Sequence, residues 1–279
     1  MGNTENAITT NTKYIDVNGV TYAYRRFGKP SAVPVVGFQH FTGTLDNWDP
    51  IIVDGLAKER EVIIFDNTGV GNSTGTTPDN VADMTRDAVA FIEALGVKQT
   101  DVLGFSLGGF IAQQLGQFYP ELVRKLIIVG AAPQGAKVLE GFPALISRAT
   151  EKEPAELFLY IFFTETQESR NKGRATLQRL YSRTEDRVKE TKQDAVLAQM
   201  KAITSWGTAP VTIDLKSIKH PILIIQGSND EMMDSYTSYQ LFQQLPNAVL
   251  IYYPDAAHGS FYQYPERFVN QANDFLNNF

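Results

Sequence analysis

Ser106 is the residue whose surroundings most clearly indicate chemistry. It is the middle residue of Gly104-Phe105-Ser106-Leu107-Gly108, a G-x-S-x-G pattern between an apolar run at 101–105 and a helix-like stretch at 110–118. Where a strand turns sharply into a helix, this pattern exposes a strained serine, and the glycines avoid collisions between the two elements. We therefore predict that Ser106 is a nucleophile and that the Leu107 amide, at the helix N-terminus, stabilises an oxyanion. The alternative is a glycine-rich turn with an incidental serine.

A serine nucleophile needs a base that takes its proton, and the usual base is histidine. The chain has three histidines. His258 follows the last apolar run, at 248–253, and precedes a C-terminal helix, which predicts that it lies at the same sheet edge as Ser106. His220 stands at the start of a strand, so we expect it at the opposite edge as a structural or surface residue. His40 follows the third apolar run and is interpreted with the segment around it.

The base in such a site is oriented by a carboxylate. Asp230 follows the apolar run at 222–225, and the chain order Ser106, Asp230, His258 is the order expected when the nucleophile turn joins a strand to a helix. The segment after the sixth apolar run, at 130–133, holds no acid, so the other common position for this residue is empty. Asp230 is therefore the predicted acid. The alternatives are Glu231, Asp234 and Asp255.

Eight short apolar runs are typical of strands. Asn18-Gly19 between the first two predicts a type I′ hairpin, so this pair should be antiparallel. Later runs alternate with helix-period segments such as 81–95, which is followed by Gly96. This alternation predicts an α/β fold with a mostly parallel, eight-stranded sheet and helices on both faces. The runs are 14–17, 20–27, 33–38, 62–65, 101–105, 125–129, 222–225 and 248–253.

The alternation of strands and helices is interrupted between strands 6 and 7. Amphipathic, charge-rich stretches at 156–163 and 174–200 contain no convincing strand and predict helices. We expect residues 134–210 to form a helical cap over the carboxyl ends of the strands, where open α/β sheets bind ligands, and residues 1–133 and 211–279 to form the core. The cap is interpreted as a lid, and the alternative is a purely stabilising excursion.

Composition excludes several classes of function. The 279 residues are 43% hydrophobic and 20% charged, as in an ordinary globular protein of one large domain. The net charge of −6 and a pI near 5.2 do not favour nucleic-acid binding. The absence of cysteine excludes disulfides, thiolate metal sites and cysteine nucleophiles. The polar N-terminus shows no secretory signal, and Asn6 does not fit an acylation signal at Met1-Gly2. No segment predicts a membrane span. We therefore expect a cytoplasmic monomer or homodimer without a membrane or nucleic-acid partner.

Two further segments of the sequence resemble segments of a known protein family. Gln39-His40-Phe41-Thr42-Gly43 is similar to a His-Gly-x-x-Gly oxyanion loop, and residues 66–73 resemble the glycine-rich turn that follows strand four in that family. Trp48 falls where an aromatic residue is common. Together with the serine turn and the positions of Asp230 and His258, these segments resemble the α/β-hydrolase superfamily over essentially the whole chain.

The resemblance implies roles for the residues of the 39–43 loop. Phe41 replaces the usual glycine, and the second oxyanion amide is expected at Thr42, with Phe41 next. His40 is expected to shape the loop and not to act as the base. Thr68 stands where an arginine is common, which removes a buried charge contact. The turn at 69–71 is not interpreted as a nucleotide site, because it lacks the third glycine and does not follow the first strand of a βαβ unit.

These features predict a two-step acyl transfer without a cofactor or metal. His258 would deprotonate Ser106, the serine oxygen would attack a carbonyl, and water would release the acid. The expected substrate is a small to medium, largely apolar carboxylic ester or lactone. A C–C bond hydrolase or a perhydrolase with the same three residues is an alternative, and so is a non-catalytic small-molecule receptor on a hydrolase fold. A serine at position 106 argues against dehalogenation and epoxide hydrolysis, which need a carboxylate nucleophile.

Overall fold

A twisted sheet forms the middle of the molecule in the computed structural model, which describes residues 6–279 and therefore not Met1 or Gly2. Its strands are β1 (Lys13–Val17), β2 (Val20–Gly28), β3 (Val35–Phe38), β4 (Glu61–Phe65), β5 (Thr100–Phe105), β6 (Val123–Val129), β7 (Ile222–Gly227) and β8 (Ala248–Tyr253). They lie in the order β1-β2-β4-β3-β5-β6-β7-β8. The pairs β1–β2 and β2–β4 are antiparallel, and every other pair is parallel. The predicted eight-stranded, mostly parallel sheet is confirmed.

The first hairpin forms because its two turn residues tolerate positive φ. Asn18 has φ +52 and Gly19 has φ +83, which fit the two central positions of a type I′ turn. The hairpin register pairs Val17 with Val20.

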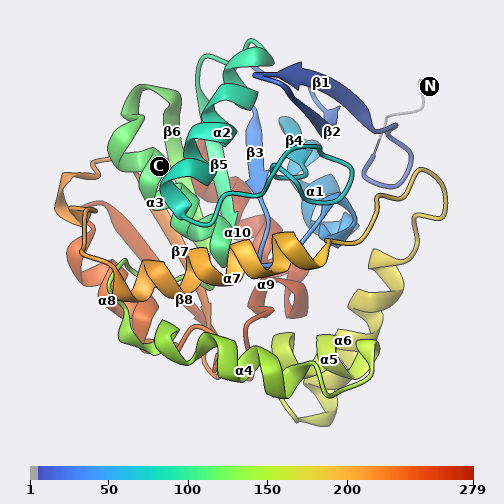
Figure 1. Ribbon diagram of the computed structural model, residues 1–279, viewed down its shortest axis with the longest axis vertical. Helices are drawn as coiled ribbons and strands as arrows, with labels where there is room; N and C mark the ends of the chain where they lie inside the picture. The colour runs from blue at the N-terminus through green and yellow to red at the C-terminus, as the bar shows by residue number, and fades with distance from the viewer. Residues whose placement is uncertain (1–5) are drawn as a thin grey trace.

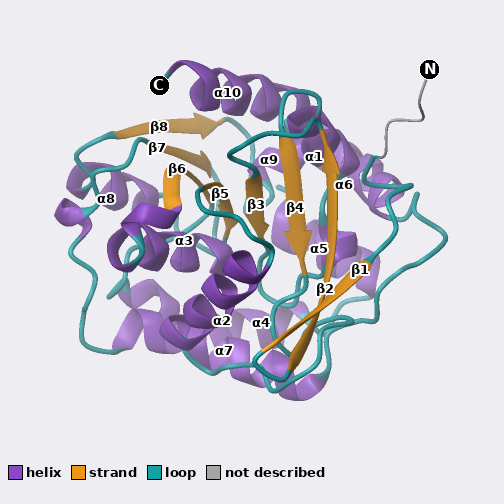
Figure 2. Ribbon diagram, turned by 90° about the horizontal axis from the view of Figure 1, so that it is seen from above, coloured by secondary structure: helices purple, strands orange, loops and turns teal. Residues whose placement is uncertain are grey.

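Helices cover both faces of the sheet. Alternate residues of β3 show this directly, because Val35 belongs to the core on the side of α1 and α10, and Val36 to the core on the side of α2 and α3. Figure 2 shows these two helix layers with the sheet between them. Within residues 6–279, no helix combines the length and the apolar character that a membrane crossing requires. The helices of these layers are α1 (Pro50–Ala57), α2 (Val81–Ala94), α3 (Leu107–Phe118), α8 (Tyr236–Gln244), α9 (Ser260–Gln263) and α10 (Pro265–Asn278).

Four further helices lie between β6 and β7 in the chain, within the segment 134–210 that we call the cap segment. They are α4 (Phe142–Ala149), α5 (Pro154–Phe162), α6 (Gln167–Leu180) and α7 (Gln193–Thr208). Figure 1 shows α4, α5 and α6 together on one side of the molecule, with α7 crossing in front of the sheet. That this segment acts as a lid stays a prediction.

The amphipathic stretch at 174–200 covers parts of two helices. Residues 181–192 form a loop between the end of α6 and the start of α7. The Arg183 guanidinium in this loop donates hydrogen bonds to the carbonyl oxygens of Ala7 and Ile8, at 3.1 and 2.7 Å, and binds the Asp186 carboxylate at 2.8 Å. Contacts with the distant N-terminal segment therefore override local helix propensity here.

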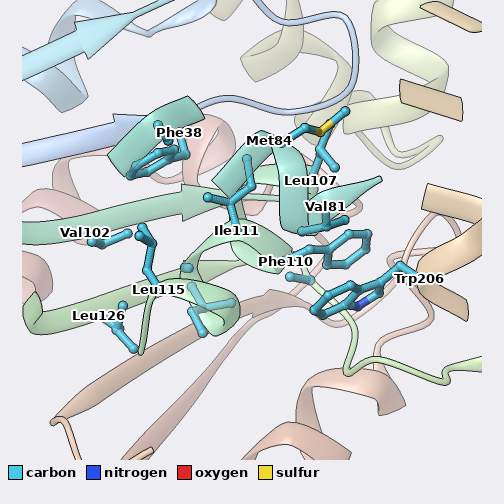
Figure 3. Packing of buried hydrophobic residues seen from close by; sticks show 14 of the residues in the cluster. Phe38, Val81, Met84, Val102, Leu107, Phe110, Ile111, Leu115, Leu126 and Trp206 are labelled. Carbon is cyan, nitrogen blue, oxygen red and sulfur yellow. The ribbon is translucent and has the colours of Figure 1, made fainter. Parts of the chain in front are cut away.

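The helix α7 packs directly on the helix that follows Ser106. The ring of Trp206 stacks on Phe110 of α3, and the two ring centroids are 5.1 Å apart. Figure 3 shows these two rings side by side. The indole N–H of Trp206 donates to the carbonyl oxygen of Ala132 at 3.2 Å. These contacts hold α7 in a defined position against α3.

Candidate active site

Ser106 lies in the sharp turn between β5 and α3 and is 2% exposed. Its backbone has φ +54 and ψ −112, a strained conformation for a residue other than glycine. The Ser106 amide donates to the carbonyl oxygen of Val129 on β6 at 2.9 Å, which ties the turn to the sheet. A Cβ on Gly104 would lie 2.3 Å from the Gly108 oxygen, and one on Gly108 would lie 2.1 Å from the Phe38 oxygen. Only glycine fits at these two positions, so the G-x-S-x-G pattern follows from the close approach of strand and helix.

His258 and Asp230 come together at the sheet edge where Ser106 lies. Nδ1 of His258 is 2.8 Å from Oδ2 of Asp230, and both side chains are buried. The other carboxylate oxygen, Oδ1, accepts hydrogen bonds from the amides of Met232 and Met233, both at 2.9 Å. The Gln226 side chain donates to Oδ2 at 3.2 Å. Both oxygens of the Asp230 carboxylate are thus fixed by hydrogen bonds, and the carboxylate can accept a hydrogen bond from Nδ1–H of the imidazole.

The three alternative acids lie elsewhere. Glu231 is exposed, and Asp234 accepts a hydrogen bond from the amide of Tyr236 at the start of α8. Asp255 points toward the cap segment. Within residues 6–279, none of these three carboxylates hydrogen-bonds His258.

Asp255 connects the loop that carries the histidine to the cap segment. Its two carboxylate oxygens accept hydrogen bonds from the hydroxyls of Thr164 and Thr166, each at 2.6 Å, in the connection between α5 and α6. The amide of Gly259 donates to the carbonyl oxygen of Phe162 at 2.9 Å. The cap segment therefore contacts the chain on both sides of the histidine.

The three predicted oxyanion amides differ in their hydrogen bonding. The amides of Leu107 and Phe41 have no acceptor within residues 6–279. The Thr42 amide, expected as the second donor, instead donates to Oε1 of Gln199 on α7 at 2.7 Å. Sequence reasoning missed Gln199, because nothing around position 199 distinguishes it from an ordinary helical glutamine.

His40 is buried beside the site without contacting its acid. Its Nδ1 is 2.6 Å from the carbonyl oxygen of Phe41, and its ring packs against the rings of Phe105 and Phe162. Burial lowers the pKa of His40 to about 4; the Phe41 carbonyl opposes this shift, and the nearby His258 adds to it. His40 is therefore neutral near pH 7 and donates its Nδ1 proton to the loop.

The turn after β4 binds the segment that follows the 39–43 loop. The Asp66 carboxylate accepts hydrogen bonds from the amides of Leu45, at 2.7 Å, and Asn72, at 2.9 Å. Burial raises the pKa of Asp66 to about 7, although both amides act in the opposite direction. Thr68, in the position where an arginine was expected, donates its hydroxyl proton to Asp87 at 2.7 Å.

Ser106 and His258 open into one cavity of about 580 Å³ that is lined mainly by the cap segment. Its wall is largely apolar. A polar part of the wall carries Asp46, Asn47 and Arg187, and the Asp46 carboxylate is paired with the buried Arg25 at 2.8 Å. Apolar side chains come from several helices and include Phe142 and Ile146 of α4, Phe158 and Ile161 of α5, and Leu177 and Leu180 of α6.

Comparison with known proteins shows the family to which this fold belongs. Residues 34–265 match the family model of the alpha/beta hydrolase fold. A solved structure, an alpha/beta hydrolase fold protein from Chitinophaga pinensis, is 60% identical, with coverage of 99% of this chain and 100% of that chain and a TM-score of 0.98.

Curated relatives are more distant. The 2-hydroxymuconate semialdehyde hydrolase of Pseudomonas sp. strain CF600 is 28% identical over 238 residues, which are 82% of this chain and 81% of that protein. The pimeloyl-(acyl-carrier protein) methyl ester esterase of Nitrosomonas europaea is 25% identical over 254 residues, 86% of this chain and 93% of that protein.

Proposed function

The chain belongs to the α/β-hydrolase family, and on that premise we propose that it is a serine hydrolase that cleaves carboxylic esters or lactones through an acyl-enzyme on Ser106. One observation carries the proposal: His258, which is hydrogen-bonded to Asp230, lines the same cavity as the strained Ser106. A nucleophile, a base and an acid that orients the base are the parts that this chemistry needs.

The reaction has two steps. His258 takes the proton of the Ser106 hydroxyl as Oγ bonds to the carbonyl carbon, and the carbonyl electron pair moves onto its oxygen. Collapse of this intermediate breaks the bond to the leaving oxygen, which receives the proton from His258. Water then attacks the acyl-enzyme with His258 again as base, and a second collapse releases the acid and restores Ser106.

Asp230 and the start of α3 supply the electrostatic part of this reaction. The Asp230 carboxylate accepts the Nδ1–H of His258, which leaves Nε2 as the proton acceptor and stabilises the imidazolium. Leu107 is the first residue of α3, and its amide has no acceptor in the described chain. This amide is therefore the first proposed donor to the oxyanion.

The cavity supports an apolar substrate of small to medium size. A volume of about 580 Å³ with a largely apolar wall fits an acyl or alcohol group with few charges. A relative named as a methyl ester esterase is consistent with an ester substrate. Cleavage of a C–C bond is the second candidate, because a relative of similar coverage is named as 2-hydroxymuconate semialdehyde hydrolase.

A substrate panel tests the proposal. We expect hydrolysis of p-nitrophenyl esters of rising acyl length, or of lactones, by the wild-type protein and its loss in Ser106→Ala. Ser217→Ala, an exposed serine of the short helix Leu215–Ser217, serves as the matched control and should keep full activity. Consumption of 2-hydroxymuconate semialdehyde without turnover of any ester or lactone would favour the second candidate instead.

A further inference from the structure

The peptide between Phe41 and Thr42 is bound at both of its polar ends. Its carbonyl oxygen, on Phe41, accepts a hydrogen bond from Nδ1 of His40 at 2.6 Å. Its amide, on Thr42, donates to Oε1 of Gln199 at 2.7 Å. The plane of this peptide is therefore fixed by one residue of the core and one of the cap segment.

Thr42 needs this support because of its backbone conformation. It has φ +63, and a β-branched residue rarely adopts a positive φ without contacts that impose it. A second contact from the cap segment acts on the same residue, since the hydroxyl of Thr191 donates to the carbonyl oxygen of Thr42 at 2.7 Å. The cap segment thus binds both the amide and the carbonyl of Thr42.

Gln199 is presented rigidly. Its side chain is 1% exposed, and it lies on α7, whose Trp206 stacks on Phe110 of α3. The acceptor Oε1 is therefore held at a set distance from the helix that begins at Leu107.

The remaining amides of the loop leave one free donor. His40 donates its amide to its neighbour Gln39, and Gly43 donates to the carbonyl oxygen of His40, both at 2.9 Å. With Thr42 bound to Gln199, the Phe41 amide is the one amide of residues 40–43 without an acceptor in the described chain. Phe41 also lines the cavity that contains Ser106.

We propose that Gln199 is a positioning residue that holds the oxyanion loop from the cap segment, so that the amide of Phe41, and not that of Thr42, joins Leu107 in stabilising the oxyanion. The inference rests on the proposed serine hydrolase function. Gln199 itself touches no reacting atom. Its effect is on the transition state, because it orients a donor that acts only when the carbonyl oxygen becomes negative.

The test compares Gln199→Met, which keeps the side-chain length and removes the acceptor, with Gln199→Glu, which retains an acceptor oxygen. Loss of a whole oxyanion donor lowers kcat by about 10²–10³, so a misplaced donor should lower kcat by roughly 10–100-fold in Gln199→Met. KM should change less than about 3-fold, and Gln199→Glu should recover most of the activity. Lys201→Met, an exposed position on the same helix, should behave as wild type.

The inhibition constant of a boronic acid is a second measurement, and it should not change if Gln199 only stabilises the fold. A boronate forms a tetrahedral anion on Ser106 and uses the oxyanion donors, so its inhibition constant should weaken in Gln199→Met by the same factor as kcat. If Gln199→Met is insoluble, Thr191→Val removes the other cap contact to Thr42 and is measured in the same way.

The outcomes separate this inference from the proposed function. A folded Gln199→Met with kcat and boronate affinity within about 2-fold of wild type overturns the role of Gln199, and so does a Gln199→Glu variant as impaired as Gln199→Met. A wild-type protein that hydrolyses no ester or lactone and binds no boronate overturns the proposed function itself.

Discussion

The imidazole of His258 lies against the backbone of Gly130, the first residue after β6. A Cβ at position 130 would be 3.2 Å from both Nδ1 and Cε1 of the ring, and Gly130 has φ +55, which also disfavours a side chain there. The absence of a side chain at position 130 therefore leaves room for the imidazole beside Asp230.

Gly130→Ala should displace this ring. The ring must then move by a few tenths of an ångström. Since a shift of about 1 Å in a catalytic group can cost on the order of 10²-fold in rate, we expect kcat to fall by roughly 2–10-fold with a small change in KM. Steady-state kinetics on the best p-nitrophenyl ester measures this. Gly96→Ala is the matched control, because Gly96 also has a positive φ, +75, and a Cβ there meets nothing within 4 Å. Wild-type kcat in Gly130→Ala would contradict the proposed place of His258.

Asp230→Asn tests the proposed acid against its neighbours. The neutral amide cannot stabilise the imidazolium and can hold the wrong tautomer, so kcat should fall by about 10⁴ while the fold persists. Asp255→Asn should lower the melting temperature, because it weakens the bonds to Thr164 and Thr166, with at most about a 10-fold effect on kcat. Equal losses of kcat in the two variants would contradict the assignment of Asp230.

Two neighbouring positions on α7 test whether the cavity binds the acyl group. Val196 lines the cavity, whereas Leu197 is 55% exposed and does not. Val196→Trp should reduce kcat/KM for long-chain esters at least about 10-fold more than for the acetate, since the added ring fills apolar space. Leu197→Trp should leave the chain-length profile unchanged. A profile unaffected by Val196→Trp would show that the substrate does not occupy this side of the cavity.

His40 should make stability depend on pH. Its pKa is about 4 in the folded chain and near 6.5 when unfolded, so between these pH values only the unfolded state takes up the proton. The free energy of unfolding of the wild type, relative to His40→Gln, should therefore be constant above pH 6.5 and fall by about 3 kcal/mol as pH drops to 4. Urea unfolding of both proteins at several pH values measures this difference, and the comparison cancels the opposite contribution of Asp66, whose pKa is raised. A difference that is the same at pH 7 and pH 4.5 would show that His40 is not buried as described.

The features that were predictable from the sequence depend on neighbouring residues. The turn at Ser106 requires glycines two positions away on either side, and the first hairpin requires Asn18 and Gly19 to adopt positive φ. In both places the residues that meet the constraint lie within a few positions of one another, although the constraint on Gly108 comes from the Phe38 oxygen on β3. The mostly parallel sheet with helices on both faces was predictable from the alternation of strands and helices, which is equally local.

The features that were not predictable depend on residues far apart in the chain. Gln199 and Thr42 are 157 positions apart, and no local pattern links a helical glutamine to a loop amide. The break between α6 and α7 likewise depends on Arg183 reaching the carbonyl oxygens of Ala7 and Ile8. Such contacts exist only after the sheet has brought these segments together, so propensity and periodicity do not reveal them.

The reactivity of Ser106 is the central claim, and covalent labelling tests it most directly. A fluorophosphonate should modify the wild-type protein with a stoichiometry of one, and mass spectrometry of the digested protein should place the adduct on Ser106. Labelling should be absent in Ser106→Ala and much slower in His258→Ala, because the serine then lacks its base. An unmodified wild-type protein, or an adduct that persists in Ser106→Ala, would contradict the account.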